Sequence, residues 1–171
     1  MFSVVVFYGS CTLRDVSIIP HNTYVTTWRR AMDVVDTILE ENRRVYEVLD
    51  LGFGKCRMCV CGPASAKELL MNHERIRVAT KYPNIAQNYF YNIKHQTVDL
   101  IKLNGSVELG PLVSLSDVIV DIVETGTTLK ENNLEPIETV GPISARLIAN
   151  KASYRFKTED IDILKRELSK K

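Results

Sequence analysis

The sequence lacks a long apolar run and an excess of charge of either sign. No stretch approaches the roughly 20 apolar residues that span a bilayer. The apolar start, Phe2 to Tyr8, is short for a signal peptide and lacks a basic flank, so a buried strand is the favoured interpretation. Lysine and arginine number 22 against 21 aspartate and glutamate, so few positive charges are spare for neutralising the phosphates of a nucleic acid. We therefore expect a cytoplasmic protein that binds neither membrane nor nucleic acid.

A complete metal-ligand pattern is also lacking. Cys56, Cys59 and Cys61 form C-x-x-C-x-C, but no second C-x-x-C follows and the three histidines do not cluster in the sequence. A strand over this segment would turn Cys59 and Cys61 to one face and Cys56 to the other. Reduced thiols packed as small hydrophobes are the favoured interpretation, and a zinc or iron–sulfur site is the alternative.

The 171 residues suffice for one domain or for two small lobes sharing a cleft, and their 45% hydrophobic content is ordinary for a globular protein. Alternating strand and helix patterns predict an α/β fold. The predicted strands lie within 45–62, 76–80, 98–103, 118–123 and 144–150. The last but one, VIVDIV, is nearly all β-branched, as expected of a strand covered on both faces.

Helices are predicted between these strands and at the end of the chain. Ser65 and Glu68 have the spacing of a capping box, and Thr158 is a candidate N-cap of the last helix. Apolar residues follow helical spacing at Ile85, Tyr89 and Ile93, and again at Ile161, Leu164 and Leu168. Before residue 42 the periodicity is ambiguous, and only Ala31 to Leu39 indicates a helix.

The stretch DIVETGTTLKENN, from Asp121 to Asn133, carries the main chemical signal. It follows a buried strand, and ligands of open α/β sheets bind at such strand ends. Gly126 permits a positive φ or a close approach of backbone to ligand, and three threonine hydroxyls add donors. The carboxylates of Asp121 and Glu124 suit the two hydroxyls of a ribose. The segment is neither a Walker A loop nor a dinucleotide fingerprint, and without further context a plain strand–helix connection remains the simpler interpretation.

Further motifs place this stretch in a family pattern. The pattern E-x5-G-x-[SAG]-x2-[IV]-x-D-[LIV]-x2-[ST]-G-x-T-[LM] is matched in register at Glu108, Ser116, Ile119, Asp121, Ile122, Thr125, Gly126, Thr128 and Leu129. Other stretches, including VYEVLDLGFGKCRM, RVATKYPNIAQNYF and IKLNGSVELGPLV, resemble the same family. The chain resembles the short-form ATP phosphoribosyltransferases of histidine biosynthesis from about Ile38 to Phe156.

The resemblance implies a two-lobed architecture like that of type II periplasmic binding proteins, with the active site in the cleft between the lobes. It implies a first lobe from residues 1–62 plus 142–171 and a second from residues 63–141. It also implies transfer of phosphoribosyl from phosphoribosyl pyrophosphate to N1 of ATP, with Mg²⁺ accompanying the pyrophosphate. Positioning of reactants and stabilisation of charge are the main tasks of such a protein.

The resemblance also implies roles for the residues of the pattern. Asp121 and Glu124 would be catalytic, on the ribose side. Those expected to bind substrate are Glu108, Thr125, Gly126, Thr127, Thr128 and Leu129, with the loop from Thr125 to Thr128 holding the 5-phosphate. No residue of this chain is expected to bind a metal directly.

The chain departs from the family at two places. Ser114 stands where the pattern has Gly, and the Lys-Gly-Arg segment of the family's first strand and loop is absent, so we expect an incomplete first lobe. An inactive remnant that keeps only a phosphoribosyl-binding lobe is therefore the alternative to an enzyme, and a ligand-sensing module is a weaker third. The chain ends at Lys171 without the long form's regulatory domain, which predicts a separate regulatory subunit resembling histidyl-tRNA synthetase.

Overall fold

The computed structural model describes residues 45–52, 55–144 and 146–169. The strand predicted at Phe2 to Tyr8 and the helix predicted at Ala31 to Leu39 lie outside these residues. The described chain falls into two compact units, one formed by Cys56–Ile143 and the other by the described residues before and after it. The two units are described separately below.

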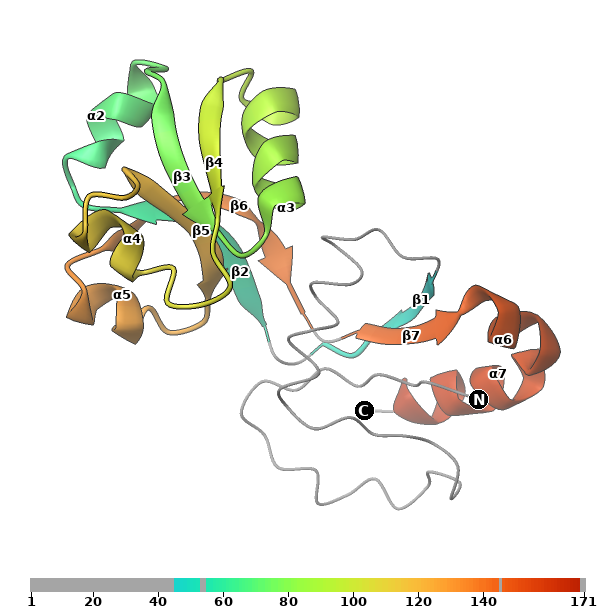
Figure 1. Cartoon of the computed structure of the whole chain (residues 1–171). Coiled ribbons are helices and arrows are strands. Elements are labelled where there is room, and N and C mark those ends of the chain that lie inside the picture. Colours follow the sequence, from blue (N-terminus) through green and yellow to red (C-terminus); the bar gives the residue numbers. More distant parts are fainter. Residues whose placement is uncertain (1–44, 53–54, 145, 170–171) are drawn as a thin grey trace. The chain divides into compact units, whose positions relative to one another are not determined.

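A five-stranded mixed sheet forms the centre of the unit Cys56–Ile143 (Figure 1). Its spatial order is β4-β3-β5-β2-β6, in which β3 runs parallel to both β4 and β5, and β2 is antiparallel to β5 and β6. The strands are β2 Cys56–Gly62, β3 Ile76–Thr80, β4 Val98–Lys102, β5 Val118–Val123 and β6 Glu135–Ile143. The parallel order of β4, β3 and β5 brings the carboxyl ends of all three to one edge of the sheet.

Short helices connect these strands, as the alternating pattern predicted. They are α2 Ala66–Met71, α3 Pro83–Gln87, the π-helix η2 Asn88–Ile93, α4 Leu109–Leu112 and α5 Thr127–Glu131. Among them, α3 lies against β4 and α4 against β5, while α5 contacts β6 (Figure 1). The helices α4 and α5 flank β5 in sequence, so β5 is held by the segments immediately before and after it.

The core explains why β5 is so apolar. Val118, Ile119 and Val120 are fully buried, so the strand is covered on both faces as predicted. A cluster of buried residues continues across one side of the sheet to α5: Cys59, Cys61, Ala79, Val107, Ile119, Val123, Leu129 and Leu134. Cys59 and Cys61 are free thiols inside this cluster, which confirms their interpretation as small hydrophobes.

The helix after β3 differs from its predicted periodicity. Its second half is a π-helix, and the Lys94 N–H donates to the Tyr89 carbonyl five residues earlier at 3.0 Å. The wider turn shifts the buried face, so Phe90 lies in the core while Ile93 is 59% exposed. The predicted apolar face through Ile93 is therefore wrong, because a step of four residues describes an α-helix and not this one.

The other unit pairs β1 Val45–Asp50 with β7 Arg146–Asn150 in antiparallel register, followed by α6 Lys151–Phe156 and α7 Thr158–Leu168. Ile161 of α7 is buried, and two further members of the predicted stripe are half-buried. No helix among the described residues combines the length and apolarity of a membrane span.

Neither predicted N-cap forms as expected. Thr158 is the first residue of α7, and its hydroxyl donates to the Tyr154 carbonyl at 2.9 Å. Ser65 precedes α2 but makes no side-chain hydrogen bond to the helix, so the predicted capping box is absent. In both helices the predicted element is present, while the local hydrogen bonding at its start differs.

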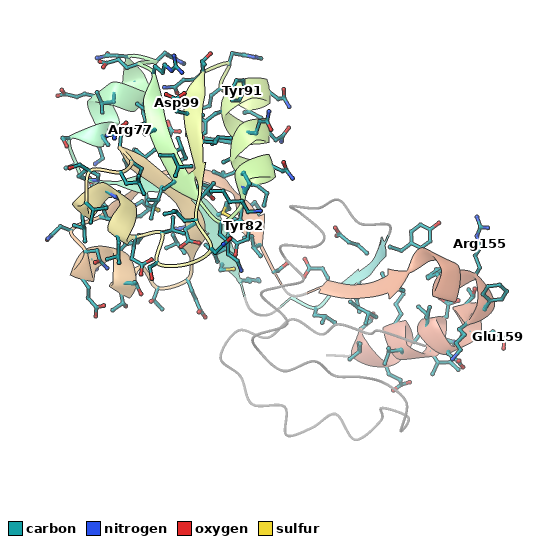
Figure 2. All side chains as sticks on the ribbon, in the orientation of Figure 1. Arg77, Tyr82, Tyr91, Asp99, Arg155 and Glu159 are labelled. Atoms are coloured by element: carbon teal, nitrogen blue, oxygen red, sulfur yellow. The ribbon has the colours of Figure 1, made fainter. Side chains whose placement is uncertain are left out.

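A charge-assisted clamp ties the start of β3 to the segment before β5. Arg77 Nη2 donates to Asp117 Oδ1 at 2.8 Å, and Arg77 Nη1 donates to the Ser114 carbonyl at 2.8 Å. The Arg77 guanidinium holds the pKa of Asp117 below its usual range. Figure 2 shows Arg77 and Tyr82 toward opposite ends of β3. The clamp therefore lies toward the opposite end of β3 from the edge where the carboxyl ends meet.

Gly110 of α4 packs so closely that no larger residue fits. A Cβ on Gly110 would stand 2.6 Å from Ser116 Oγ and 3.3 Å from the Ala79 Cβ. We expect Gly110→Ala to lower the free energy of unfolding by about 1–3 kcal/mol, measured by urea denaturation. Gly105→Ala is the control, because nothing lies within 4 Å of a Cβ there. Adding Ser116→Ala should recover part of the loss; no recovery would contradict the assigned contact.

Candidate functional site

One buried hydroxyl joins the carboxyl end of β3 to the middle of β5. Thr80 Oγ1 donates to the Val120 carbonyl at 2.7 Å and accepts from the Tyr82 N–H at 2.9 Å. Thr80 and Val120 are also register partners. Thr80 thus fixes the two residues that follow these partners, Lys81 and Asp121, at the same level of the sheet edge.

The threonine loop follows β5 directly. Gly126 has a φ of 76° and a ψ of 9°, in the left-handed region that glycine adopts without strain, which is one of the two possibilities that the sequence left open. Thr125 Oγ1 lies 3.1 Å from Thr127 Oγ1, and the Lys130 N–H donates to the Gly126 carbonyl at 3.2 Å. The side chains of Thr125, Thr127 and Thr128 are exposed. The loop therefore presents several hydroxyls to solvent from a backbone whose turn depends on one glycine.

Leu129 anchors this loop from inside. It is buried in the same apolar cluster as Val123 of β5 and Cys59 of β2. A ligand outside the loop could therefore reach only the backbone of Leu129. The side chain holds the helix that carries the threonines against the sheet.

Asp121 is the acid closest to the sheet interior. Burial raises the pKa of Asp121 above its usual range, and the carboxylate of Glu108 raises it further. Two groups lower this pKa: the Ile122 N–H, which donates to Asp121 Oδ1 at 2.8 Å, and the cation of Lys81. The structure thus brings Asp121 and Glu108 within electrostatic reach, although they lie thirteen residues apart, and adds a lysine that the sequence patterns did not indicate.

Glu124 occupies a different position. It lies just beyond the end of β5, is exposed, and raises the pKa of Cys56 in addition to the effect of burial. Burial raises the pKa of the Cys61 thiol to about 12, with further contributions from Cys59 and Asp121. Cys61 of β2 is therefore an uncharged neighbour of Asp121.

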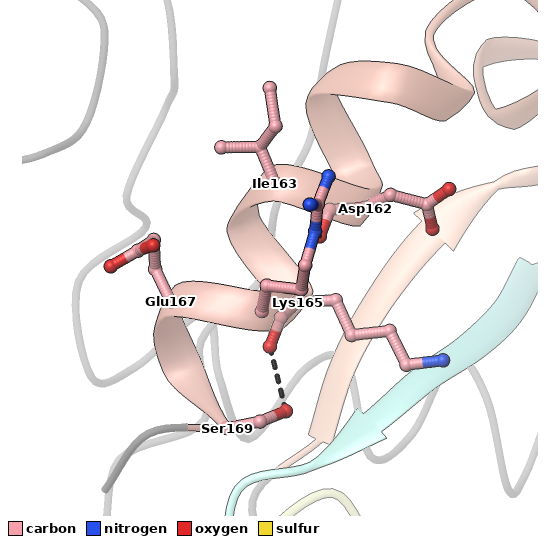
Figure 3. Close-up of a pocket in the computed structure, with 6 residues that line it drawn as sticks. Asp162, Ile163, Lys165, Glu167 and Ser169 are labelled. Carbon is pink, nitrogen blue, oxygen red and sulfur yellow. Dashed lines mark hydrogen bonds between the residues drawn. The ribbon is translucent and has the colours of Figure 1, made fainter.

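A further feature of the described residues belongs to the other unit. A shallow pocket lies along α7 (Figure 3) and is lined by Asp162, Ile163, Lys165, Arg166, Glu167 and Ser169. All of these come from one helix, and none belongs to the family pattern. Among the described residues, no group of three or more His, Cys, Asp and Glu side chains could hold a metal ion.

Ser114, the departure inside the family pattern, has a φ of 56° and so occupies the backbone conformation that glycine favours. We expect Ser114→Gly to raise the free energy of unfolding by about 1 kcal/mol, because it relieves this strain. Asn133→Gly is the matched control: Asn133 has a φ of 55°, but asparagine tolerates it, so its gain should be smaller. Urea denaturation of both variants checks this; equal gains, or a loss for Ser114→Gly, would refute it.

The fold and this edge of the sheet define a class of protein. The solved structure of Tv2483 bound to L-arginine matches the chain with a TM-score of 0.52 at 14% identity, covering 85% of this chain and 68% of that one. The structure of the GluR0 ligand-binding core with L-glutamate matches with a TM-score of 0.51 at 14% identity, covering 74% of this chain and 58% of that one. The fold is therefore α/β and like that of periplasmic binding proteins. The family model for ATP phosphoribosyltransferase (HisG) matches residues 31–170. The chain belongs to the ATP phosphoribosyltransferase family.

Individual relatives agree with this assignment. The ATP phosphoribosyltransferase of Lachnoclostridium phytofermentans is 64% identical over 141 residues, covering 81% of this chain and 66% of the relative. That of Lachnospira eligens is 60% identical over 150 residues, covering 86% and 69%. The structure of the ATP phosphoribosyl transferase (HisG:HisZ) complex from Thermotoga maritima matches with a TM-score of 0.65 at 36% identity, covering 79% of this chain and 65% of that one. The chain thus spans about two thirds of the length of these relatives.

Proposed function

We propose that the chain is an ATP phosphoribosyltransferase that transfers phosphoribosyl from phosphoribosyl pyrophosphate to N1 of ATP, the first step of histidine biosynthesis. The observation that carries this proposal is the left-handed Gly126 between exposed threonines at the end of β5. That loop stands in register with the family pattern, in a chain that belongs to the family. Cytoplasmic location is part of the proposal.

Each part of the site has a role in the proposed reaction. The loop from Thr125 to Thr128 holds the 5-phosphate through hydroxyls and main-chain N–H groups. Asp121 accepts hydrogen bonds from the ribose hydroxyls, and Glu124 lies beside it on the exposed side of the loop. Glu108 supports the ribose side from the start of α4. Leu129 contributes by holding the loop in place.

The reaction is a displacement at C1 of the ribose. The bond from C1 to the pyrophosphate oxygen breaks, the bond from C1 to N1 of ATP forms, and the electron pair leaves with the pyrophosphate. Positive charge develops on the ribose as its leaving group departs, and the carboxylates of Asp121 and Glu124 face that charge. No residue of the chain is assigned to Mg²⁺, which would accompany the pyrophosphate of the substrate and would offset the negative charge of the leaving group.

The proposal includes the lobes and the partner. We take the described unit Cys56–Ile143 as the second lobe, because β2 Cys56–Gly62 pairs with β5 and β6, and residues 1–55 plus 144–171 as an incomplete first lobe. We take a regulatory subunit resembling histidyl-tRNA synthetase as the partner. The T. maritima match, named as a HisG:HisZ complex, supports a hetero-oligomer of this kind.

The test is an assay for phosphoribosyl-ATP formation by the purified chain, with and without purified regulatory subunit. The expected result is product that depends on phosphoribosyl pyrophosphate, ATP and Mg²⁺, and that increases when the subunit is added. Absence of product in both arms would overturn the proposed activity.

A second candidate function is an inactive remnant that binds phosphoribosyl pyrophosphate without transferring it. It is favoured by one observation: all the proposed site residues lie in the unit Cys56–Ile143, which has its own core. Calorimetric titration with phosphoribosyl pyrophosphate distinguishes the candidates. Binding without product supports the remnant, while product supports the enzyme.

A further inference from the structure

Lys81 stands at the acid site without any role assigned by the family pattern. It follows the last residue of β3, and Asp121 follows Val120, the register partner of that residue. Neighbouring strands lie roughly 5 Å apart, so the two residues begin from adjacent points of the sheet edge. The hydroxyl of Thr80, which bonds both Val120 and the residue after Lys81, fixes this relation.

The side chain of Lys81 is held as well as its backbone. Lys81 is half-buried, and its Nζ lies 5.8 Å from the centre of the Tyr82 ring, within the range of a cation–π contact. Tyr82 is fully buried, so the surface on which the lysine lies is rigid. The cation is therefore kept near the edge of the sheet.

The groups around Asp121 show why a cation matters there. Glu108 at the start of α4 adds negative charge, and the thiol of Cys61 on β2, whose pKa is raised to about 12, adds none. Arg57, also on β2, lowers the pKa of Cys61. From α5, the buried Leu129 lies in the same apolar cluster as Cys59, the register partner of Asp121. A bound ribose would remove water from Asp121, which disfavours its charged form further.

We propose that Lys81 is a positioning residue of the phosphoribosyl site, which keeps Asp121 ionised so that it can accept hydrogen bonds from the ribose hydroxyls. This inference rests on the proposed function, because it assumes that ribose binds at Asp121. It differs from a direct contact between Lys81 and a phosphate. A direct contact would matter most at alkaline pH, where the ligand's phosphates carry their full charge, whereas a lysine acting through Asp121 matters most at acid pH, where that carboxylate becomes protonated.

The first experiment needs no ligand. The carboxyl carbon of Asp121, identified by its absence in Asp121→Asn, is titrated by NMR in the full chain. The pKa of Asp121 should rise in Lys81→Met, stay near the wild-type value in Lys81→Arg, and fall in Glu108→Gln. An unchanged pKa in Lys81→Met would overturn the proposal.

The second experiment measures calorimetric affinity for phosphoribosyl pyrophosphate between pH 5.5 and 8.5. Lys81→Met should bind roughly three- to tenfold more weakly at the acid end and near wild-type strength at the alkaline end. Lys81→Arg should follow the wild type, as should Lys165→Met, which removes an exposed lysine of α7. The ligand's own phosphates titrate alike in every variant, so differences report on the protein.

The outcomes separate the two proposals. A loss for Lys81→Met that is as large or larger at the alkaline end would overturn the positioning role and indicate a direct phosphate contact instead. Failure of the wild-type chain to bind at any pH would overturn the proposed function and, with it, the role of Lys81 in a ribose site. The NMR titration would then still show whether Lys81 and Asp121 are coupled.

Discussion

Gly126→Val should abolish measurable binding of phosphoribosyl pyrophosphate, with a loss on the order of a hundredfold or more. Gly126 has a φ of 76°, which a β-branched residue adopts only at a substantial cost. Space is not the obstacle, since a Cβ would meet only Val123 Cγ1 at 3.8 Å. The valine instead forces the backbone out of the left-handed region, which turns the N–H groups of Thr127 and Thr128 away from a bound phosphate.

A matched control separates this effect from strain in general. Gly52, after β1, has a φ of 72° and no atom within 4 Å of a built Cβ. Gly52→Val imposes the same backbone strain outside the loop, so it should keep wild-type affinity in the same calorimetric titration. Unchanged affinity in Gly126→Val, or an equal loss in both variants, would refute the phosphate loop.

Parts of this fold follow from local sequence and parts do not. The predicted strands at 76–80 and 118–123 match the structure to the residue, and β-branched residues make up three of the five residues of IRVAT and five of the six of VIVDIV. The strand β6 was missed, since Pro136, Gly141 and Pro142 interrupt its pattern. It lies at the edge of the sheet, where missing hydrogen-bond donors are tolerated. The π-helix was missed because its wider turn has no compositional signal.

The same distinction between local and non-local information applies to the site. The position of the threonine loop followed from the order of residues after an apolar run, and the positive φ of Gly126 was one of two possibilities at that glycine. The approach of Glu108 and Lys81 to Asp121 depends on which strands and helices are neighbours, and no local pattern contains that information. Once β3 is placed beside β5, the residue after each strand end becomes a candidate. That rule would have found Lys81.

Asp121→Asn should weaken binding of phosphoribosyl pyrophosphate and at the same time stabilise the protein. Because burial raises the folded pKa of Asp121, the ionised carboxylate costs stability at neutral pH. Asparagine keeps the shape and can still accept the Ile122 N–H, which lies 2.8 Å from Oδ1, without carrying the charge. Affinity should fall roughly ten- to hundredfold, since hydrogen bonds to a charged acceptor become neutral ones.

The effect of Asp121→Asn on the free energy of unfolding should depend on pH. An acid whose pKa is raised on folding contributes stability below its unfolded pKa, and this stability is lost as pH rises through the folded pKa. The gain in the free energy of unfolding from Asp121→Asn should therefore be present at pH 7 and vanish below about pH 4. Asp117 is the opposite case, because Arg77 lowers its pKa. Asp117→Asn should therefore destabilise at pH 7, and its cost should shrink as pH falls. Urea midpoints of both variants at several pH values decide the matter: if Asp121→Asn is destabilising at pH 7, its carboxylate is favourably paired and the account of the acid site is wrong.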